Sequence, residues 1–143
     1  MKKTLSKLLL AAVIAAPFTA NASSEKQDLL AVITSGDSMT QFMGLVLATQ
    51  AKKQGANVEV LFCSKAADLV IKGAEEVTFK PKGLSANKLL QGLIKSGANV
   101  GVCPPYLPNN AKTKADLIDG VSVAKPPKIA AKMLKEDTQV ITY

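Results

Sequence analysis

Short apolar runs that alternate with helix-like segments constrain the fold of this chain more than any other feature. The first run, Leu29–Ile33, is apolar throughout rather than at every second residue, which is typical of a strand covered on both faces, as in a parallel sheet. Further runs of strand length are Val58–Cys63, Val100–Cys103, Val121–Val123 and Thr138–Tyr143. Segments with apolar residues at helical spacing separate these runs. The alternation predicts an α/β domain whose mostly parallel sheet has helices on both faces.

The first 22 residues predict a cleavable secretory signal. A start rich in lysine precedes an apolar stretch, Leu8–Phe18, that is too short to span a bilayer. Ala20 and Ala22 are small residues at the two positions that signal cleavage requires. We therefore expect cleavage after Ala22, export to the periplasm, and a single domain over residues 23–143 without a membrane span.

The basic residues do not indicate a nucleic-acid partner. All 18 of them are lysines, and three lie in the predicted signal, so the exported part has only a mild excess over the 11 acidic residues. Without arginine the chain lacks the bidentate fork that reads guanine edges and grips phosphates. Aromatic residues make up only 4% of the chain, so stacking platforms for single strands are scarce. We interpret the lysines as a solvated surface.

The residue types that are missing exclude several kinds of site. The chain has no histidine, which excludes a Ser-His-Asp triad, a Cys-His pair and every zinc site that includes histidine. Cys63 and Cys103 are the only cysteines, too few for a zinc site made of cysteine alone. The glycine-rich dinucleotide fingerprint and the P-loop pattern are also absent. We expect neither a metal nor an organic cofactor.

Cys103 is the first candidate for chemistry. It ends a predicted strand, and in an open parallel sheet ligands and reactions gather beyond the carboxyl ends of the strands. The alternative is a small apolar residue that closes a strand, since free cysteine is among the most buried residue types. Pro104 and Pro105 remove the backbone donors after the sulfur, so a reactive thiolate would need lysines or N–H groups from elsewhere. Cys63 also ends a predicted strand, and an exported compartment permits a disulfide.

The segment Pro104–Asn110 is expected to be neither regular helix nor central strand, because its prolines lack N–H donors and restrict the residues before them. It is either a functional loop or a rigid connector. Within it, Tyr106 either directs its hydroxyl at the Cys103 sulfur or lies on the surface. We retain Pro104 and Tyr106 as residues that line the site.

Asp37 and Ser38 lie in the turn after the first predicted strand, where related folds often hold a phosphate at a helix start. The Asp37 carboxylate would repel an anion, so helix capping is the better interpretation, with Ser38 opening a capping-box pattern. Both residues remain candidates for lining a site. Met39, Met43 and Met133 are attributed to packing rather than to copper binding.

Three short sequence motifs stand out: Val-Gly-Val-Cys ending at Cys103, Lys-Pro-Lys-Gly-Leu at residues 80–84, and Asp-Leu-Ile-Asp-Gly-Val-Ser-Val at residues 116–123. Together with the order of the elements, these motifs resemble the DsrE/DsrF-like family. The chain resembles the small exported members of the family over Leu29–Tyr143. The resemblance implies a three-layer α/β/α domain with a five-stranded, mostly parallel sheet. It also implies a homo-oligomer, commonly a trimer or a hexamer.

The resemblance gives Cys103 a specific role. Relatives in sulfur oxidation and transfer-RNA thiolation hold sulfur as a persulfide on a cysteine at the end of the strand that matches Val100–Cys103. The implied function is therefore an exported sulfur carrier or thiol-redox protein, rather than a conventional enzyme. It would act through Cys103, with Cys63 as its partner and a sulfur-donor or thiol-redox protein as its reactant. The alternative is a non-catalytic oligomeric module with structural cysteines, in which the segment around Tyr106 lines a ligand or protein surface.

Whether Cys63 and Cys103 can pair depends on the order of the strands. If the family's sheet places the second and third of these strands side by side, the two cysteines emerge at one edge about 5 Å apart, a Cα separation that a disulfide tolerates. In a flavodoxin-like order the first strand would lie between them and no bond could form.

Overall fold

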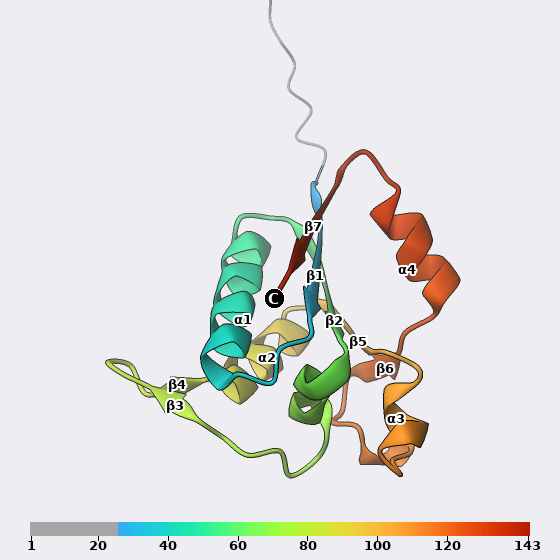
Figure 1. Ribbon diagram of the computed structural model, residues 1–143. Coiled ribbons are helices and arrows are strands. Elements are labelled where there is room, and N and C mark those ends of the chain that lie inside the picture. Colours follow the sequence, from blue (N-terminus) through green and yellow to red (C-terminus); the bar gives the residue numbers. More distant parts are fainter. Residues whose placement is uncertain (1–25) are drawn as a thin grey trace, which may run out of the picture.

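Five parallel strands form the centre of the structure, a computed structural model that describes residues 26–143 (Figure 1). The strands are β1 (Asp28–Ile33), β2 (Asn57–Phe62), β5 (Asn99–Val102), β6 (Val121–Val123) and β7 (Thr138–Thr142). Their order across the sheet is β6-β5-β2-β1-β7, and every neighbouring pair is parallel. The predicted five-stranded α/β fold is thereby confirmed. The predicted signal peptide, residues 1–22, lies outside the described residues.

Helices cover the two faces of this sheet unequally. The long helices α1 and α2 lie together on one face and α4 lies alone on the other (Figure 1). The helices are α1 (Ser38–Lys53), α2 (Ala86–Lys95), α3 (Tyr106–Asn109) and α4 (Pro126–Met133), with 3-10 helices η1 (Ser64–Val70) and η2 (Lys114–Asp116). A two-stranded antiparallel hairpin, β3 (Thr78–Phe79) and β4 (Leu84–Ser85), precedes α2. Across residues 26–143, no helix combines the length and apolarity that crossing a membrane requires.

The face under α1 and α2 holds the apolar core. Alternate residues of the central strands point into it, among them Ile33, Phe62 and Val102, all with no exposed surface. Leu45 of α1 and Leu90 of α2 close this layer from above. Burying one such side chain stabilises the fold by about 1.5–3 kcal/mol, so this layer fixes the strand register and the strand ends.

The face under α4 is held by charge as well as by apolar contact. No residue of α4 is fully buried. Lys132 reaches back to the sheet, with its Nζ 3.1 Å from a Glu59 carboxylate oxygen and 3.8 Å from one of Asp28. Lys135 adds a second contact to Asp28 at 3.5 Å. Because the Lys132 side chain is only 16% exposed and that of Asp28 only 10%, the contacts that Lys132 makes lie largely out of water.

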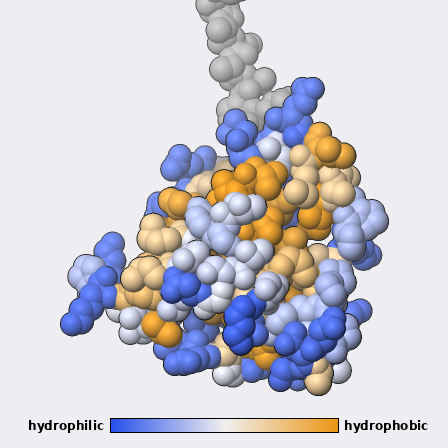
Figure 2. All heavy atoms as spheres, viewed as in Figure 1, coloured by the Kyte–Doolittle hydropathy of each residue, from blue (hydrophilic) through white to orange (hydrophobic). Residues whose placement is uncertain are grey.

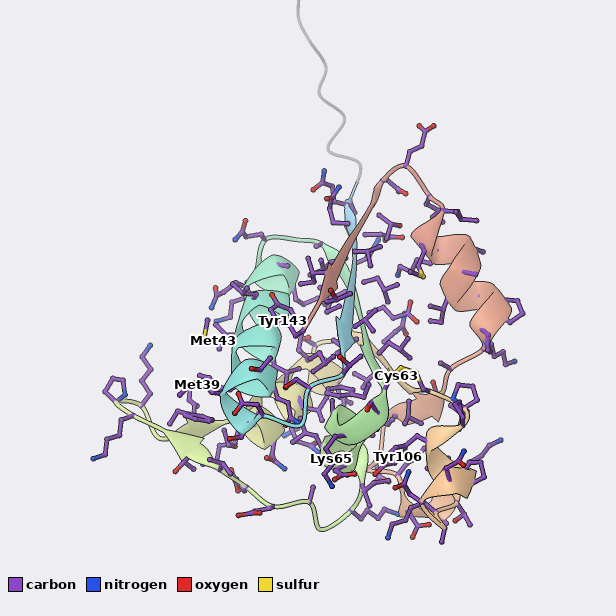
Figure 3. All side chains as sticks on the ribbon, viewed as in Figure 1. Met39, Met43, Cys63, Lys65, Tyr106 and Tyr143 are labelled. Atoms are coloured by element: carbon purple, nitrogen blue, oxygen red, sulfur yellow. A yellow bond between two sulfur atoms is a disulfide. The ribbon has the colours of Figure 1, made fainter. Side chains whose placement is uncertain are left out.

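The packing interpretation of the methionines is wrong. Met39, Met43 and Met133 are 53%, 43% and 48% exposed. The fully buried positions of α1 include Gly44 and Leu45, so its core-facing stripe lies beside the methionines rather than through them. Figure 3 shows Met39 and Met43 on the side of α1 away from the sheet.

Replacing Lys132 with alanine should lower the free energy of unfolding by on the order of 2 kcal/mol, because it leaves the Asp28 and Glu59 carboxylates without their shared counter-charge. Urea unfolding followed by circular dichroism would measure the loss. Lys128→Ala is the matched control, since Lys128 lies on the same helix and is exposed. Equal losses in the two variants would contradict this account of how α4 is held.

Candidate functional site

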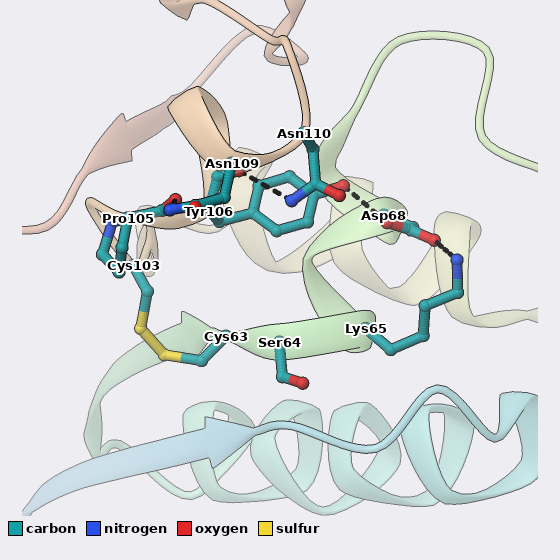
Figure 4. Close-up of a pocket in the computed structure, with 9 residues that line it drawn as sticks. All are labelled: Cys63, Ser64, Lys65, Asp68, Cys103, Pro105, Tyr106, Asn109 and Asn110. Atoms are coloured by element: carbon teal, nitrogen blue, oxygen red, sulfur yellow. Dashed lines mark hydrogen bonds and ion pairs between the residues drawn. A yellow bond between two sulfur atoms is a disulfide. The ribbon is translucent and has the colours of Figure 1, made fainter.

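The two cysteines meet at the carboxyl edge of the sheet. Cys63 follows β2 and Cys103 follows β5, and these strands are direct neighbours. The Cys103 backbone N–H donates to the carbonyl of Phe62 at 2.9 Å, which extends the ladder one residue beyond the end of β5. The two Cα atoms are 5.1 Å apart and the side chains form a disulfide (Figure 4). The flavodoxin-like order, which would have separated the cysteines, is therefore excluded.

A hollow of about 490 Å³ opens beside the disulfide. Its walls are the two segments that leave the sheet after the cysteines: η1 after Cys63 and α3 after Cys103. The residues that line it are Cys63, Ser64, Lys65, Asp68, Cys103, Pro105, Tyr106, Asn109 and Asn110 (Figure 4). Both cysteines are partly exposed, so a reactant in this hollow would lie against the S–S bond.

Asp68 connects the two walls. One carboxylate oxygen accepts a hydrogen bond from the Tyr106 hydroxyl at 2.5 Å, and the other lies 2.5 Å from the Lys65 Nζ (Figure 4). Burial alone would raise the pKa of the Asp68 carboxyl, but hydrogen bonds from Lys65 and Tyr106 and the charges of Lys65 and Lys112 outweigh it and lower the pKa. Burial, and then the bond to Asp68, raise the pKa of Tyr106. At neutral pH the pair is therefore a charged carboxylate and a neutral hydroxyl.

Tyr106 differs from both sequence expectations. Its side chain is buried, at 8% exposure, so it is not a surface residue. Its hydroxyl donates to Asp68, so the structure gives it a partner other than the Cys103 sulfur. Tyr106 does line the hollow beside the disulfide, as one of its walls.

The segment after Cys103 contains a helical turn that the sequence did not predict. Tyr106–Asn109 forms α3 directly after the double proline, with Pro105 as its N-cap. The turn tolerates Pro108 because N–H groups in the first turn of a helix have no intrahelical acceptor to lose. The side-chain amides of Asn109 and Asn110 donate to the carbonyls of Pro105 and Tyr106 and fix the turn.

The other predicted residues lie outside the hollow beside the disulfide. Pro104 lines a separate apolar hollow of about 210 Å³ under α4, which Cys103 also borders. Ser38 lines a third hollow that shares Lys65 and Asp68 with the first. Asp37 lines none of these three hollows, and its carboxylate accepts from the Thr40 N–H at 2.8 Å. Capping of α1 is thus confirmed, but the cap is Asp37 and not Ser38.

Lys65 and Asp68 were missed in the sequence. Their spacing of three residues directly after Cys63 was the available signal, since such pairs meet on one helical face. A Cβ atom at Gly36 would lie 2.5 Å from the Lys65 Cγ, so glycine lets the turn before α1 approach this side chain. In residues 26–143, no group of three or more potential ligands among Cys, Asp and Glu is placed to hold a metal ion.

Comparison with known proteins supports the fold. The structure is similar to the crystal structure of the ychN protein from E. coli, with a TM-score of 0.66 and 20% identity, covering 82% of this chain and 99% of that one. It is also similar to MTH1491, a protein of unknown function from Methanobacterium thermoautotrophicum, with a TM-score of 0.60 and 14% identity, covering 83% and 100%. No protein-family model and no curated sequence matches the chain. These likenesses show that the chain shares its α/β fold with the ychN protein and with MTH1491.

The lowered pKa of Asp68 predicts a pH dependence of stability. A carboxyl whose pKa is lower in the folded state stabilises the fold above its ordinary pKa of 3.8, and that contribution is lost as the pH falls through the folded value. The difference in unfolding free energy between wild type and Asp68→Asn should therefore be largest near neutral pH and shrink below about pH 4. Urea titrations across this range would measure it, with Asp119→Asn, at an exposed carboxyl, as the control. A difference that stays constant with pH would contradict the assignment.

Proposed function

We propose that the chain is a sulfur carrier or thiol-redox protein that acts through Cys103, with Cys63 as its exchange partner. The single observation that carries this proposal is the position of the disulfide: at the carboxyl edge of the sheet, partly exposed, beside a hollow large enough for a small reactant. The resemblance to the DsrE/DsrF-like family supports it, because that resemblance assigns a persulfide to the cysteine at this strand end.

The chemistry needs the two cysteine sulfurs, a small thiol as reductant and a persulfide as sulfur donor. A small thiol reduces the disulfide in two exchanges: its thiolate attacks one cysteine sulfur and expels the other cysteine as a thiolate, and a second thiol then releases the first cysteine. In the reduced pair, the Cys103 thiolate attacks the outer sulfur of a donor persulfide, which forms a Cys103 persulfide and releases the donor as a thiolate. The Cys63 thiolate then attacks the inner sulfur of that persulfide. Hydrosulfide leaves and the disulfide forms again.

Export to the periplasm belongs to the same proposal. A disulfide between the only two cysteines suits an oxidising compartment, where such bonds form and persist. The partner would be a sulfur donor or a thiol-redox protein that reaches the hollow between η1 and α3.

We extend the proposal to a homo-oligomer, as the family resemblance implies. Met39, Met43 and Leu47 form an exposed apolar stripe on α1, and α1 has no charged residue before Lys52. The neighbouring edge strand β7 contains no lysine or proline to block pairing, and Figure 2 shows apolar side chains gathered over this region. A second copy is the fitting occupant, because two basic chains can approach through this uncharged face without repulsion between like charges.

A specific observation favours the alternative, a binding module with structural cysteines. The hollow under α4 is lined almost entirely by apolar side chains, among them Leu61, Ile129 and Met133. Such a lining suits an apolar ligand that does not react. The two functions differ in one respect that can be tested: a carrier needs Cys103 for its activity, whereas a binding module would keep its activity without the cysteines.

Cysteine variants should separate the two functions. After reduction and exposure to a persulfide donor, Cys63→Ser should accumulate a mass increase of one sulfur atom, because the thiol that would release it is missing. Cys103→Ser should gain no sulfur. Intact-mass spectrometry would measure both, and circular dichroism would confirm folding. Equal loading of the two variants, or none in either, would contradict a carrier role for Cys103.

The α1 stripe can be tested by adding charge. Met43→Lys should convert the wild-type assembly to monomers. In an interface between two copies of the chain, each new lysine would lose its water and lie near the same positive charge on the other copy. Sedimentation velocity would give the oligomeric state. Val77→Lys is the matched control, since Val77 is an exposed apolar residue outside α1. A monomeric wild type, or the same assembly in Met43→Lys, would contradict this surface.

A further inference from the structure

The two segments that follow the cysteines are joined twice. At the sheet edge the disulfide links Cys63 to Cys103. At the far side of the hollow, Asp68 and Tyr106 form a second link, five and three residues beyond the cysteines (Figure 4). Reduction removes the first link and leaves the second in place.

We propose that the hydrogen bond between Asp68 and Tyr106 positions the two cysteine thiols for each other and so sets the redox equilibrium of the pair. The inference rests on the thiol chemistry proposed above and assigns Asp68 and Tyr106 as positioning residues. Neither residue has to touch the reactant.

The argument compares the oxidised and the reduced protein. One disulfide and two small thiols give two cysteine thiols and one small-molecule disulfide, so two electrons pass to the protein. In the oxidised form the S–S bond already confines η1 and α3. In the reduced form the end of the β2–β5 ladder, the buried apolar residues of both segments and the Asp68–Tyr106 bond still confine them, and of these only that bond is a side-chain hydrogen bond between the two segments. Without that bond, the two segments gain conformational entropy in the reduced form, whereas the disulfide still restrains them in the oxidised form. The reduced form is therefore favoured, and the disulfide becomes easier to reduce.

The ladder alone does not fix the segments beyond it. Ser64, directly after Cys63, has a left-handed φ of 54°, so the chain turns out of the strand direction at once. Pro104 and Pro105 follow Cys103 on the other segment, and because proline has no backbone N–H they cannot continue the hydrogen bonding of the ladder. The next side-chain tie between these segments is the Asp68–Tyr106 bond.

Several features strengthen the hydrogen bond between Asp68 and Tyr106. Its acceptor is a carboxylate, its length is 2.5 Å, and the Tyr106 side chain is buried at 8% exposure. Lys65 occupies the second carboxylate oxygen and keeps Asp68 oriented. The aliphatic part of Lys65 is itself held against the turn at Gly36.

The test is the equilibrium constant for disulfide formation in a glutathione redox buffer, measured by thiol alkylation and intact mass. Tyr106→Phe keeps the ring and removes the bond, and should lower this constant about two- to tenfold, the range that one hydrogen bond contributes. A tenfold change corresponds to about 30 mV for this two-electron couple. Asp68→Asn replaces the charged acceptor with a neutral amide oxygen, which weakens the bond and should shift the constant in the same direction. The double variant should shift it no further than Tyr106→Phe alone, because that change already removes the bond.

Tyr143→Phe is the matched control and should leave the constant unchanged, since Tyr143 follows the edge strand β7. If Tyr106→Phe and Asp68→Asn fold and leave the constant unchanged, with only the urea midpoint of unfolding lowered, the inference is overturned. The Asp68–Tyr106 bond would then contribute to stability alone. That failure differs from failure of the proposed function. Loss of sulfur loading at Cys103 would refute the carrier even if the redox equilibrium shifts as expected.

Discussion

The pairing of β2 with β5 is the constraint on which the rest of this structure depends. Parallel strands in direct contact end at the same edge, so the residues that follow them are neighbours without any further arrangement. The ladder extends to the Cys103 N–H, which places the two cysteine Cα atoms 5.1 Å apart. Any other strand between β2 and β5 would leave two separate thiols and no site.

Packing on both faces of the sheet holds the carboxyl edge in place. The dry layer under α1 and α2 fixes the strands, with Phe62 and Val102 buried directly before the two cysteines. On the other face α4 is held partly by the charges of Lys132. The site therefore stands on rigid strand ends, while its walls are short segments joined by polar contacts.

The sequence predicted the parts of this structure that depend on local pattern. Continuous apolar runs placed the strands, and glycine and capping residues placed the ends of α1 and α2, although the cap of α1 proved to be Asp37 rather than Ser38. Strand order stayed open between two alternatives until the structure was in hand, because period and composition contain no information on which strands are neighbours. The Asp68–Tyr106 bond joins residues 38 positions apart, and no local pattern could pair them. Exposure of Met39 and Met43 was misjudged because α1 is apolar on both sides, so hydropathy could not tell its core face from its outer face.

The central claim is that reactants reach the disulfide in the folded protein, and the kinetics of its reduction test this most directly. The rate of reduction by dithiothreitol can be compared with the rate of global unfolding measured under the same conditions. The account predicts reduction without unfolding, at a rate proportional to the concentration of the reductant. A rate that is independent of reductant and equal to the unfolding rate would contradict it, because the bond would then be sealed in the native state.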